Sequence, residues 1–377
     1  MKRVIITPLD VIHFGSSRPF YKGENFIALQ GDITPLPFAG AIRSKILSTK
    51  TNGEIPSNWY EIESHPDLKE VVEIVGTPTS AGKISFFGLY AYAVDPSKNE
   101  LFLCPNDIVR YEDNRDSKLL LKPCKFDKFK INDDIYPVMS KPNGSFYVKE
   151  DKEFITRSGL ERYLEEGDTS NANAFIPKSS VIFEERRVGI ELDKDKKTTK
   201  EGMFYSINYI RLCEGHAFSL WINDSFNLPS RGILKIGSKG RYASYEVTDN
   251  NDKFTFSNII KDINKARKFK LYLSTPAIFF GKNDNENICI PSTEKLNKKL
   301  GVTTKLISMI QGKPMRIGGW DMAKNRQKPL RYAVRSGAVY FYKIDDQRNI
   351  DEKIEMPVMI SDTDSWLGLG SAFIGRW

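Results

Sequence analysis

Basic residues, glycines and a tryptophan gather in one segment of this 377-residue chain, Lys313–Arg335. Cations neutralise phosphates, glycines let a backbone approach a ligand closely, and an exposed indole stacks on a nucleobase. The segment therefore predicts a surface that binds a polyanion. The alternative is a basic loop that only faces water, with Trp320 buried in the core, as tryptophan often is. The residues that carry this chemistry are Lys313, Arg316, Lys324, Arg326, Lys328, Arg331, Arg335, Gly318, Gly319 and Trp320, beside one acid, Asp321.

A second candidate for phosphate binding is the short sequence Gly237-Ser238-Lys239-Gly240-Arg241, which joins two predicted strands. Adjacent backbone N–H groups in such a loop converge on an anion, and the two cations add charge. The spacing is not that of a nucleotide-binding phosphate loop. A plain hairpin turn is therefore the alternative interpretation.

His13 is the one histidine that lies near another cluster of functional residue types, Arg18-Pro19-Phe20. A histidine acts as general base on a ribose hydroxyl, and Arg18 would stabilise the charge that develops on phosphate. The alternative is a hydrogen-bonded structural histidine, because no second acid or base stands nearby in sequence. No recognisable enzyme motif occurs in the chain, so we expect a protein without catalytic activity.

Composition and charge fit a soluble globular protein with an acidic partner. The net charge is +8 and the pI is near 9.0, which favours nucleic acid first and an anionic membrane surface second. Seven basic residues against one acid make Lys313–Arg335 the source of six of those charges. The positive charge is therefore local.

The cysteines and histidines are too few and too scattered for a zinc site, and we expect no metal and no cofactor. The N-terminal apolar run is too short for a secretory signal, and no segment has the ~20 apolar residues needed to cross a bilayer. These features predict a cytoplasmic protein with reduced thiols. The cysteines and histidines are Cys104, Cys124, Cys213, Cys289, His13, His65 and His216.

The first part of the chain alternates strands with a helix. Thr34 and Pro35 provide a cap and a first-turn proline, and Phe38, Ile42 and Ile46 then repeat every fourth residue on one helical face. Strands are predicted at Arg3–Thr7, Val11–Phe14, Ile84–Tyr92 and Glu100–Leu103.

Residues from about 105 to 177 lose this periodicity, and we predict an irregular insertion that projects from the core, with one short helix at Gly159–Glu166. Two long strands then flank the polar run Asp193–Lys200, which predicts a hairpin. Order resumes at Val181–Phe183 and Val188–Glu191 before the polar run and at Met203–Leu212 after it, and strands at Phe218–Ile222 and Gly232–Ile236 follow.

Lys268–Leu273 alternates apolar and polar residues, which predicts a half-buried strand with Lys270 and Tyr272 on its outer face. Thr293–Gln311 has a cap, an acidic first turn and apolar spacing that predict a helix, broken by Gly301. Ala338–Ile344 is a further strand. Strands and helices recur without regular alternation, so the fold class is α+β, with two small units and mainly antiparallel sheets.

Several blocks of the chain, in the same order, resemble one protein family. That family is the third subunit of the Cmr module, in type III-B CRISPR RNA-guided effector complexes, within the RAMP superfamily. The blocks are Pro8–Phe20, Phe38–Arg43, Arg187–Glu191, Glu201–Phe204, Gly318–Asp321, Lys328–Arg331 and Ser336–Phe341.

The resemblance implies two ferredoxin-like (RRM-like) domains with antiparallel sheets and a Gly-rich loop: residues 1–257, with the insertion at about 105–177, and residues 258–377. It also implies a non-catalytic RNA-binding role in antiviral defence, in which the subunit holds the 5′ tag of the CRISPR RNA. The large polymerase-like subunit and the first backbone subunit would be its protein partners. The residues expected to contact RNA are Arg18, Arg43, Arg187, Gly237, Ser238, Lys239, Gly240, Arg241, Trp320, Lys328 and Arg331.

Two other functions remain open at this point. One is a CRISPR-RNA processing endoribonuclease of the same superfamily, with His13 as base. The other is a general RNA-binding protein outside CRISPR systems. Cleavage of repeat RNA that depends on His13 would identify the first, and stable isolation without Cmr subunits would favour the second.

Overall fold

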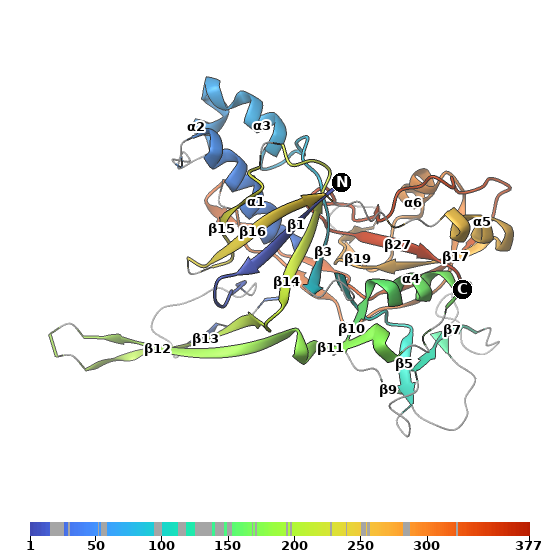
Figure 1. Cartoon of the computed structure of the whole chain (residues 1–377), viewed down its shortest axis with the longest axis horizontal. Coiled ribbons are helices and arrows are strands. Elements are labelled where there is room, and N and C mark those ends of the chain that lie inside the picture. The colour runs from blue at the N-terminus through green and yellow to red at the C-terminus, as the bar shows by residue number, and fades with distance from the viewer. Residues whose placement is uncertain are drawn as a thin grey trace.

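The computed structural model of the chain shows a mixed α+β protein with several antiparallel sheets, which confirms the predicted class (Figure 1). Two large sheets, of eight and five strands, dominate it. The structure describes residues 1–15, 26–28, 31–51, 53, 59–93, 100–111, 118–124, 138–139, 147–148, 153–167, 169, 172–193, 195–196, 198–226, 228–238, 240–249, 254, 257–281, 287–321 and 323–377.

The first half of the chain builds the eight-stranded sheet, in the order β11-β10-β4-β3-β14-β1-β16-β15, with every pairing antiparallel. The strands predicted at the start of the chain, around residue 90 and after residue 215 all belong to it. Only Ile12 of the predicted Val11–Phe14 strand forms a bridge, to Ile210. The strands are β1 (Lys2–Pro8), β3 (Phe86–Ala93), β4 (Glu100–Leu103), β10 (Glu153–Thr156), β11 (Phe175–Pro177), β14 (His216–Ile222), β15 (Arg231–Lys235) and β16 (Tyr242–Asp249).

Three helices, α1 (Pro35–Lys50), α2 (Trp59–Ser64) and α3 (Lys69–Val75), connect β1 to β3. The predicted apolar face of α1 is buried against the sheet, since Phe38, Ile42 and Ile46 lie in one core with Val4 and Ile6 of β1. Thr34 is the N-cap residue as expected, but its side chain makes no capping hydrogen bond.

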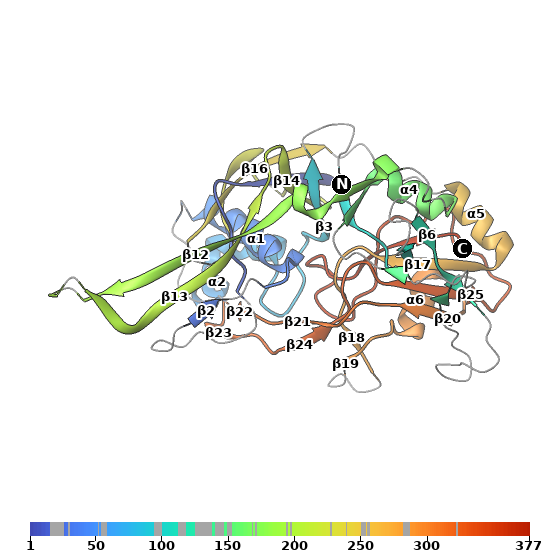
Figure 2. The same cartoon turned by 90° about the horizontal axis from the view of Figure 1, so that it is seen from below.

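The predicted hairpin is a long arm made of β12 (Ile182–Leu192) and β13 (Thr199–Leu212), with β2 (Phe26–Ala28) parallel to β13. It extends well away from the two sheets in both views (Figures 1 and 2). We call it the arm. Strand β12 begins at Ile182 and runs through both predicted segments, Val181–Phe183 and Val188–Glu191, and β13 begins four residues before the predicted Met203.

The prediction that residues 105–177 project from the core is wrong for the end of that range. Strand β10 pairs with β4 inside the main sheet, and α4 (Arg157–Glu165) buries Leu160, Tyr163 and Leu164 in the core. The remaining short strands of this range are β5 (Ile108–Tyr111), β6 (Lys118–Leu120), β7 (Lys122–Pro123), β8 (Val138–Met139) and β9 (Tyr147–Val148).

The second half of the chain builds the five-stranded sheet, in the order β20-β25-β17-β27-β26. Helix α6 (Thr293–Leu300) connects β17 to β20, and α5 (Ser257–Ala266) precedes β17. The strands are β17 (Lys268–Leu273), β20 (Thr304–Ile310), β25 (Val339–Ile344), β26 (Val358–Met359) and β27 (Ser371–Gly375), with a side pair β18 (Phe279–Phe280) and β19 (Asn287–Ile288).

Two predictions in this half are corrected. Helix α6 ends at Gly301, whose φ of 72° gives a left-handed cap, and the residues predicted to continue the helix form strand β20. Strand β17 is not half-buried, because Lys270 and Tyr272 are as fully buried as the apolar residues beside them. The reason is that α4 and the N-terminal sheet cover its second face.

The two halves share one hydrophobic core. Tyr90, Phe102 and Trp221 of the first sheet pack in the same cluster as Phe269 and Phe373 of the second. Among the described residues, no helix is long and apolar enough to span a membrane.

Candidate nucleic-acid interface

The basic segment predicted from the sequence folds as a second, shorter hairpin. Strand β21 (Met315–Ile317) pairs with β24 (Arg331–Ala333), and β22 (Trp320–Asp321) pairs with β23 (Arg326–Gln327). Between these pairs the amide of Lys328 donates a 2.9 Å hydrogen bond to the carbonyl oxygen of Gly319. We call Met315–Ala333 the basic hairpin.

Alternation along the basic hairpin divides its side chains between the core and the solvent. Met315, Ile317 and Ala333 are buried in a small cluster with Ile278 and Leu369. The side chains between them point outward, so most of the cations face solvent. Trp320 is 53% exposed, which excludes the alternative in which it fills the core.

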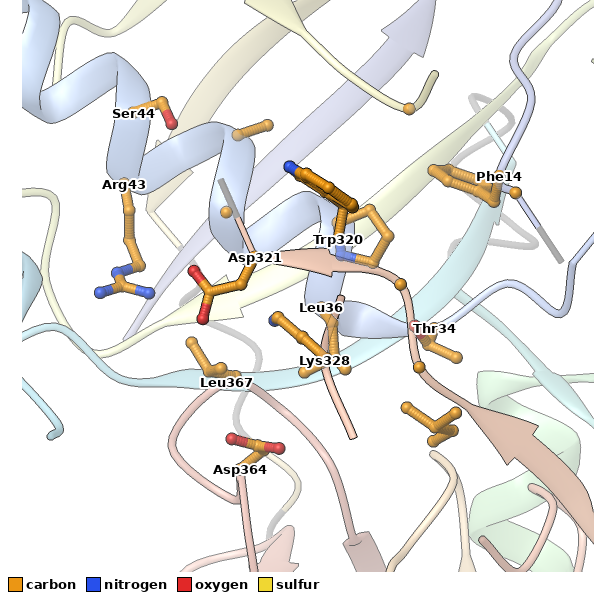
Figure 3. A pocket seen from close by; sticks show the side chains of 18 of the residues that line it. Phe14, Thr34, Leu36, Arg43, Ser44, Trp320, Asp321, Lys328, Asp364 and Leu367 are labelled. Carbon is orange, nitrogen blue, oxygen red and sulfur yellow. The ribbon is translucent and has the colours of Figure 1, made fainter. Parts of the chain in front are cut away.

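A groove with a volume of about 1730 Å³ lies between α1, the end of β15 with its glycine loop, and the basic hairpin (Figure 3). Its lining includes the exposed Trp320 and Tyr242. Cations outnumber acids in that lining, since it contains Arg43, Lys45, Lys235, Arg316, Lys328 and Arg335 against Asp32, Asp321 and Asp364. The groove is therefore positively charged and partly aromatic.

Five of the residues predicted to contact RNA line this groove: Arg43, Gly237, Ser238, Trp320 and Lys328. They come from three separate parts of the chain, and the fold brings them together. Gly240, Arg187, Arg241 and Arg331 do not line it. Arg18 and Lys239 lie outside the described residues.

The glycine loop between β15 and β16 is closed by a hydrogen bond from the amide of Ile236 to the carbonyl of Arg241. Gly237 and Gly240 have φ angles of 71° and 66°, a left-handed conformation that glycine adopts without strain. A Cβ on Gly237 would lie 2.6 Å from the carbonyl oxygen of His13, whereas a Cβ on Gly240 would meet nothing within 4 Å. Gly237 is therefore needed for packing, and Gly240 leaves space at the surface.

Arg43 is held by the protein itself. Its Nε donates a 2.7 Å hydrogen bond to the carbonyl of Val75, one Nη donates to Thr77, and the guanidinium lies 4.7 Å from the ring centroid of Trp366. Burial lowers the pKa of Arg43 to about 10, against the raising effect of Asp321 and Asp364. Arg43 thus connects the end of α3 to the floor of the groove.

Asp321, Lys328 and Asp364 are grouped near Arg43 in the groove, with the indole of Trp320 above them in this view (Figure 3). Burial raises the pKa of Asp364, while the charges of Lys328, Arg331 and Arg43 act in the opposite direction. Arg331 also lies 4.8 Å from the ring centroid of Phe280, which fixes it at the base of the basic hairpin.

Arg187 and Arg241 meet in a charged cluster beside the groove, at the base of the arm. Sequence reasoning missed the residues that join them there: Asp10, which follows β1, and Glu185 and Arg211 on the arm. Their separation along the chain is large, since Asp10 and Arg241 are 231 residues apart. No local pattern carries that signal.

His13 is 3% exposed, and its Nδ1 lies 2.9 Å from the carbonyl oxygen of Asn208. Its ring also meets Tyr209 edge-on, with centroids 5.7 Å apart. Within the described parts of the chain, no three histidines, cysteines or carboxylates are placed to share a metal ion.

The fold and the site define a class of protein: an α+β protein with antiparallel sheets and a basic, partly aromatic groove. The family model described as CRISPR-associated protein (Cas_Cmr3) matches residues 4–377, and the chain belongs to this family, a subunit of type III-B Cmr complexes. The resemblance stated from the sequence is thereby confirmed.

Solved structures similar to this chain include a chain of the type III-B Cmr-beta complex bound to cognate target RNA and AMPPnP, at 16% identity and a TM-score of 0.49, covering 90% of this chain and 86% of that one. A chain from the crystal structure of the Csm3–Csm4 subcomplex of a type III-A complex is similar at 13% identity and a TM-score of 0.38, covering 100% of this chain and 99% of that one. A comparison with curated proteins finds no match.

Proposed function

We propose that this subunit is a non-catalytic RNA-binding protein that holds the 5′ tag of the CRISPR RNA in a type III-B effector complex. The observation that carries this proposal is the groove between α1, the glycine loop and the basic hairpin. Its charge and its exposed aromatic residues suit a single strand of RNA.

Single-stranded nucleic acid is generally held by cations that follow the phosphates and by aromatic rings on which bases stack. Lys328 and Arg316 supply cations to the groove, and the half-exposed indole of Trp320 supplies a stacking surface. Gly237 and Ser238 of the glycine loop line the opposite wall. These contacts position a strand by its backbone and stack its bases.

Strand order supports the assignment of each large sheet to a ferredoxin-like domain. In the first, β16-β1-β14-β3 are antiparallel neighbours and α1 lies between β1 and β3. In the second, β27-β17-β25-β20 repeat that arrangement, with α6 between β17 and β20. In both halves no helix occurs between the third and fourth of these strands within the described residues.

We further propose that the large polymerase-like subunit and the first backbone subunit are the protein partners. RNA bound in the groove would leave the arm and the faces away from the groove available for contacts with these protein partners. The arm offers exposed apolar side chains for the purpose, among them Val188, Ile190 and Leu192.

The test is the salt dependence of RNA binding by the assembled complex. Because each phosphate neutralised on a single strand contributes about 0.7 to the slope of log affinity against log salt, Lys328→Ala with Arg331→Ala should reduce the slope by up to about 1.4. The control is Lys261→Ala with Lys265→Ala on α5, which removes the same charge far from α1 and β15, the elements beside the groove (Figure 1). An equal slope in all three proteins would assign the basic hairpin to folding or to a protein interface.

A further inference from the structure

Three arginines converge on one carboxylate at the base of the arm. Arg187 donates to both oxygens of Asp10, at 3.1 and 3.3 Å, Arg211 donates to one at 2.9 Å, and Arg241 to the other at 3.4 Å. Glu185 accepts from Arg187 and Arg211 as well. The five side chains carry three positive and two negative charges, so the cluster keeps a net charge of +1.

Three guanidinium groups offer more hydrogen-bond donors than the one carboxylate of Asp10 can accept from. Guanidinium groups bind phosphate oxygens in the same forked geometry as they bind carboxylates. The Nε of Arg241 is also buried without a hydrogen-bond partner among the described residues. Hydrogen bonds from Arg187 and Arg211 lower the pKa of Asp10, so its carboxylate is charged at neutral pH and stands in for an anion.

The arginines do not depend on Asp10 for their positions. The ring of Tyr209, which is buried, holds Arg187 and Arg241 by cation–π contacts at 5.5 and 4.8 Å, and Glu185 holds Arg211. Asp10, in contrast, lies just beyond the end of β1, beside the 62% exposed Leu9. Its carboxylate can therefore leave while the three guanidinium groups remain.

The cluster is also accessible and lies next to the groove. The side chains of Asp10, Arg187 and Arg211 are 41, 37 and 34% exposed. The amide of Leu9 donates to the carbonyl of Tyr242, a residue of the groove lining, and Arg241 ends the glycine loop. A strand that leaves the groove past the glycine loop meets these arginines next.

We propose that Asp10 occupies the position of a phosphate in the RNA-free subunit, and that a backbone phosphate of the RNA displaces it to bind Arg187, Arg211 and Arg241. Partly exposed ion pairs contribute only modestly to stability, so a phosphate can displace Asp10, although Asp10 still competes with it. Asp10 thereby lowers the affinity for RNA and keeps the arginines neutralised when no RNA is bound. This inference rests on the proposed function and adds a second phosphate site beside the groove.

The test compares wild type with Asp10→Asn in RNA titrations at several salt concentrations, with the full chain and two RNAs of equal length, one of repeat sequence and one of polyuridine. Asp10→Asn should bind both RNAs more tightly, on the order of tenfold at low salt, because the arginines no longer pair with a carboxylate and can bind a phosphate. The factor should be the same for both RNAs, because phosphates carry no sequence information. Its salt slope should rise by about 0.7. The matched control is Glu246→Gln, which removes an acid from an ion pair with Arg231 at the sheet edge and should bind as wild type does.

Equal or weaker binding by folded Asp10→Asn would overturn the inference and make Asp10 a residue that only positions the arginines. If Asp10→Asn does not fold, Arg211→Gln is tested in its place, and a salt slope equal to that of wild type in Arg211→Gln would also overturn the inference. The Lys328 and Arg331 substitutions could reduce the salt slope while Asp10→Asn gives no gain of affinity. That result would contradict the second phosphate site and leave the proposed function intact. Absence of RNA binding in every variant would remove the proposed function with it.

Discussion

The backbone amide of Ser238 donates a 2.8 Å hydrogen bond to the carbonyl oxygen of His13. This contact attaches the glycine loop to the segment after β1, at the same carbonyl that excludes a side chain on Gly237. The contact connects the glycine loop, which forms one wall of the groove, to His13, the candidate base of the endoribonuclease alternative. The imidazole of the same residue is buried and lies 2.9 Å from the carbonyl oxygen of Asn208, which supports a structural role for His13.

The two glycines of the loop should respond differently to substitution. Gly240→Val places its side chain in open space and costs about 1–2 kcal/mol for the left-handed conformation. The subunit should therefore stay folded and bound to the large subunit proposed as its partner, but it should retain less RNA because the new side chain keeps RNA away from the loop backbone. Gly237→Val adds a clash with His13 and should lower the melting temperature further. A pull-down that measures RNA and partner together checks this, and joint loss in Gly240→Val would mean that this glycine also serves the fold.

Trp320 should contribute to RNA affinity and not to stability. Base–aromatic stacking is worth about 1–3 kcal/mol per base, which corresponds to about a 5- to 150-fold loss of affinity for Trp320→Ala. Because the side chain is 53% exposed, the melting temperature should change little. Trp320→Phe keeps a stacking ring and should recover most of the affinity; a loss equal to that of alanine would argue against stacking.

Lys270 should make the stability of the protein depend on pH above neutrality. Burial lowers its pKa to about 8, although Asp107 acts to raise it, and its Nζ lies 3.2 Å from the ring centroid of Tyr163. The unfolded chain has the ordinary lysine pKa of about 10.4 and binds more protons than the folded chain above pH 8, so the free energy of unfolding should rise with pH there, by about 1 kcal/mol between pH 7.5 and 9.

Urea denaturation at pH 7.5 and 9 measures this rise. At higher pH the buried tyrosines, whose pKa values burial raises, would oppose it. The Lys270→Met variant should lack it, since it has no amine to titrate at this position. Lys343→Met, an exposed lysine of β25, is the control and should keep the rise. A rise of equal size in Lys270→Met would assign the effect to other groups.

We predict no nuclease activity. The imidazole of His13 is 3% exposed and lies at hydrogen-bonding distance from a backbone carbonyl, so it cannot reach a ribose hydroxyl without rearrangement. Repeat RNA and target RNA incubated with the purified protein should stay intact, with or without divalent metal. Site-specific cleavage that is lost in His13→Ala would establish the endoribonuclease alternative instead.

Sequence patterns predicted those features that depend on neighbours along the chain. The spacing of Phe38, Ile42 and Ile46 gave the buried face of α1, and the polar run between two strands gave the arm. The end of α6 was visible in Gly301. The residues after it, Val302, Thr303 and Thr304, are β-branched and lead into strand β20, which begins at Thr304 and which the apolar spacing concealed.

Features that depend on distant contacts were not predictable in this way. The sequence pattern predicts that Lys270 faces solvent, and only the packing of the N-terminal part of the chain against the five-stranded sheet buries it. The chemistry of the basic hairpin was visible in its composition, whereas the groove needs α1 and the glycine loop beside it. Asp10 carries no signal at all, since its three arginines follow it by 177 to 231 residues.

The arm and the basic hairpin leave their sheets at equivalent places, between β3 and β14 in one half and between β20 and β25 in the other. Each of these strand pairs is antiparallel and adjacent, so the ends of both connections stay one strand spacing apart. The first connection also contains β4, α4, β10 and β11. Lengthening a loop in either connection adds little closure entropy and disturbs no sheet hydrogen bond. This geometry makes the same connection in both halves the place where evolution can add or exchange recognition elements, and where a protein engineer can insert a label with the least harm to the fold.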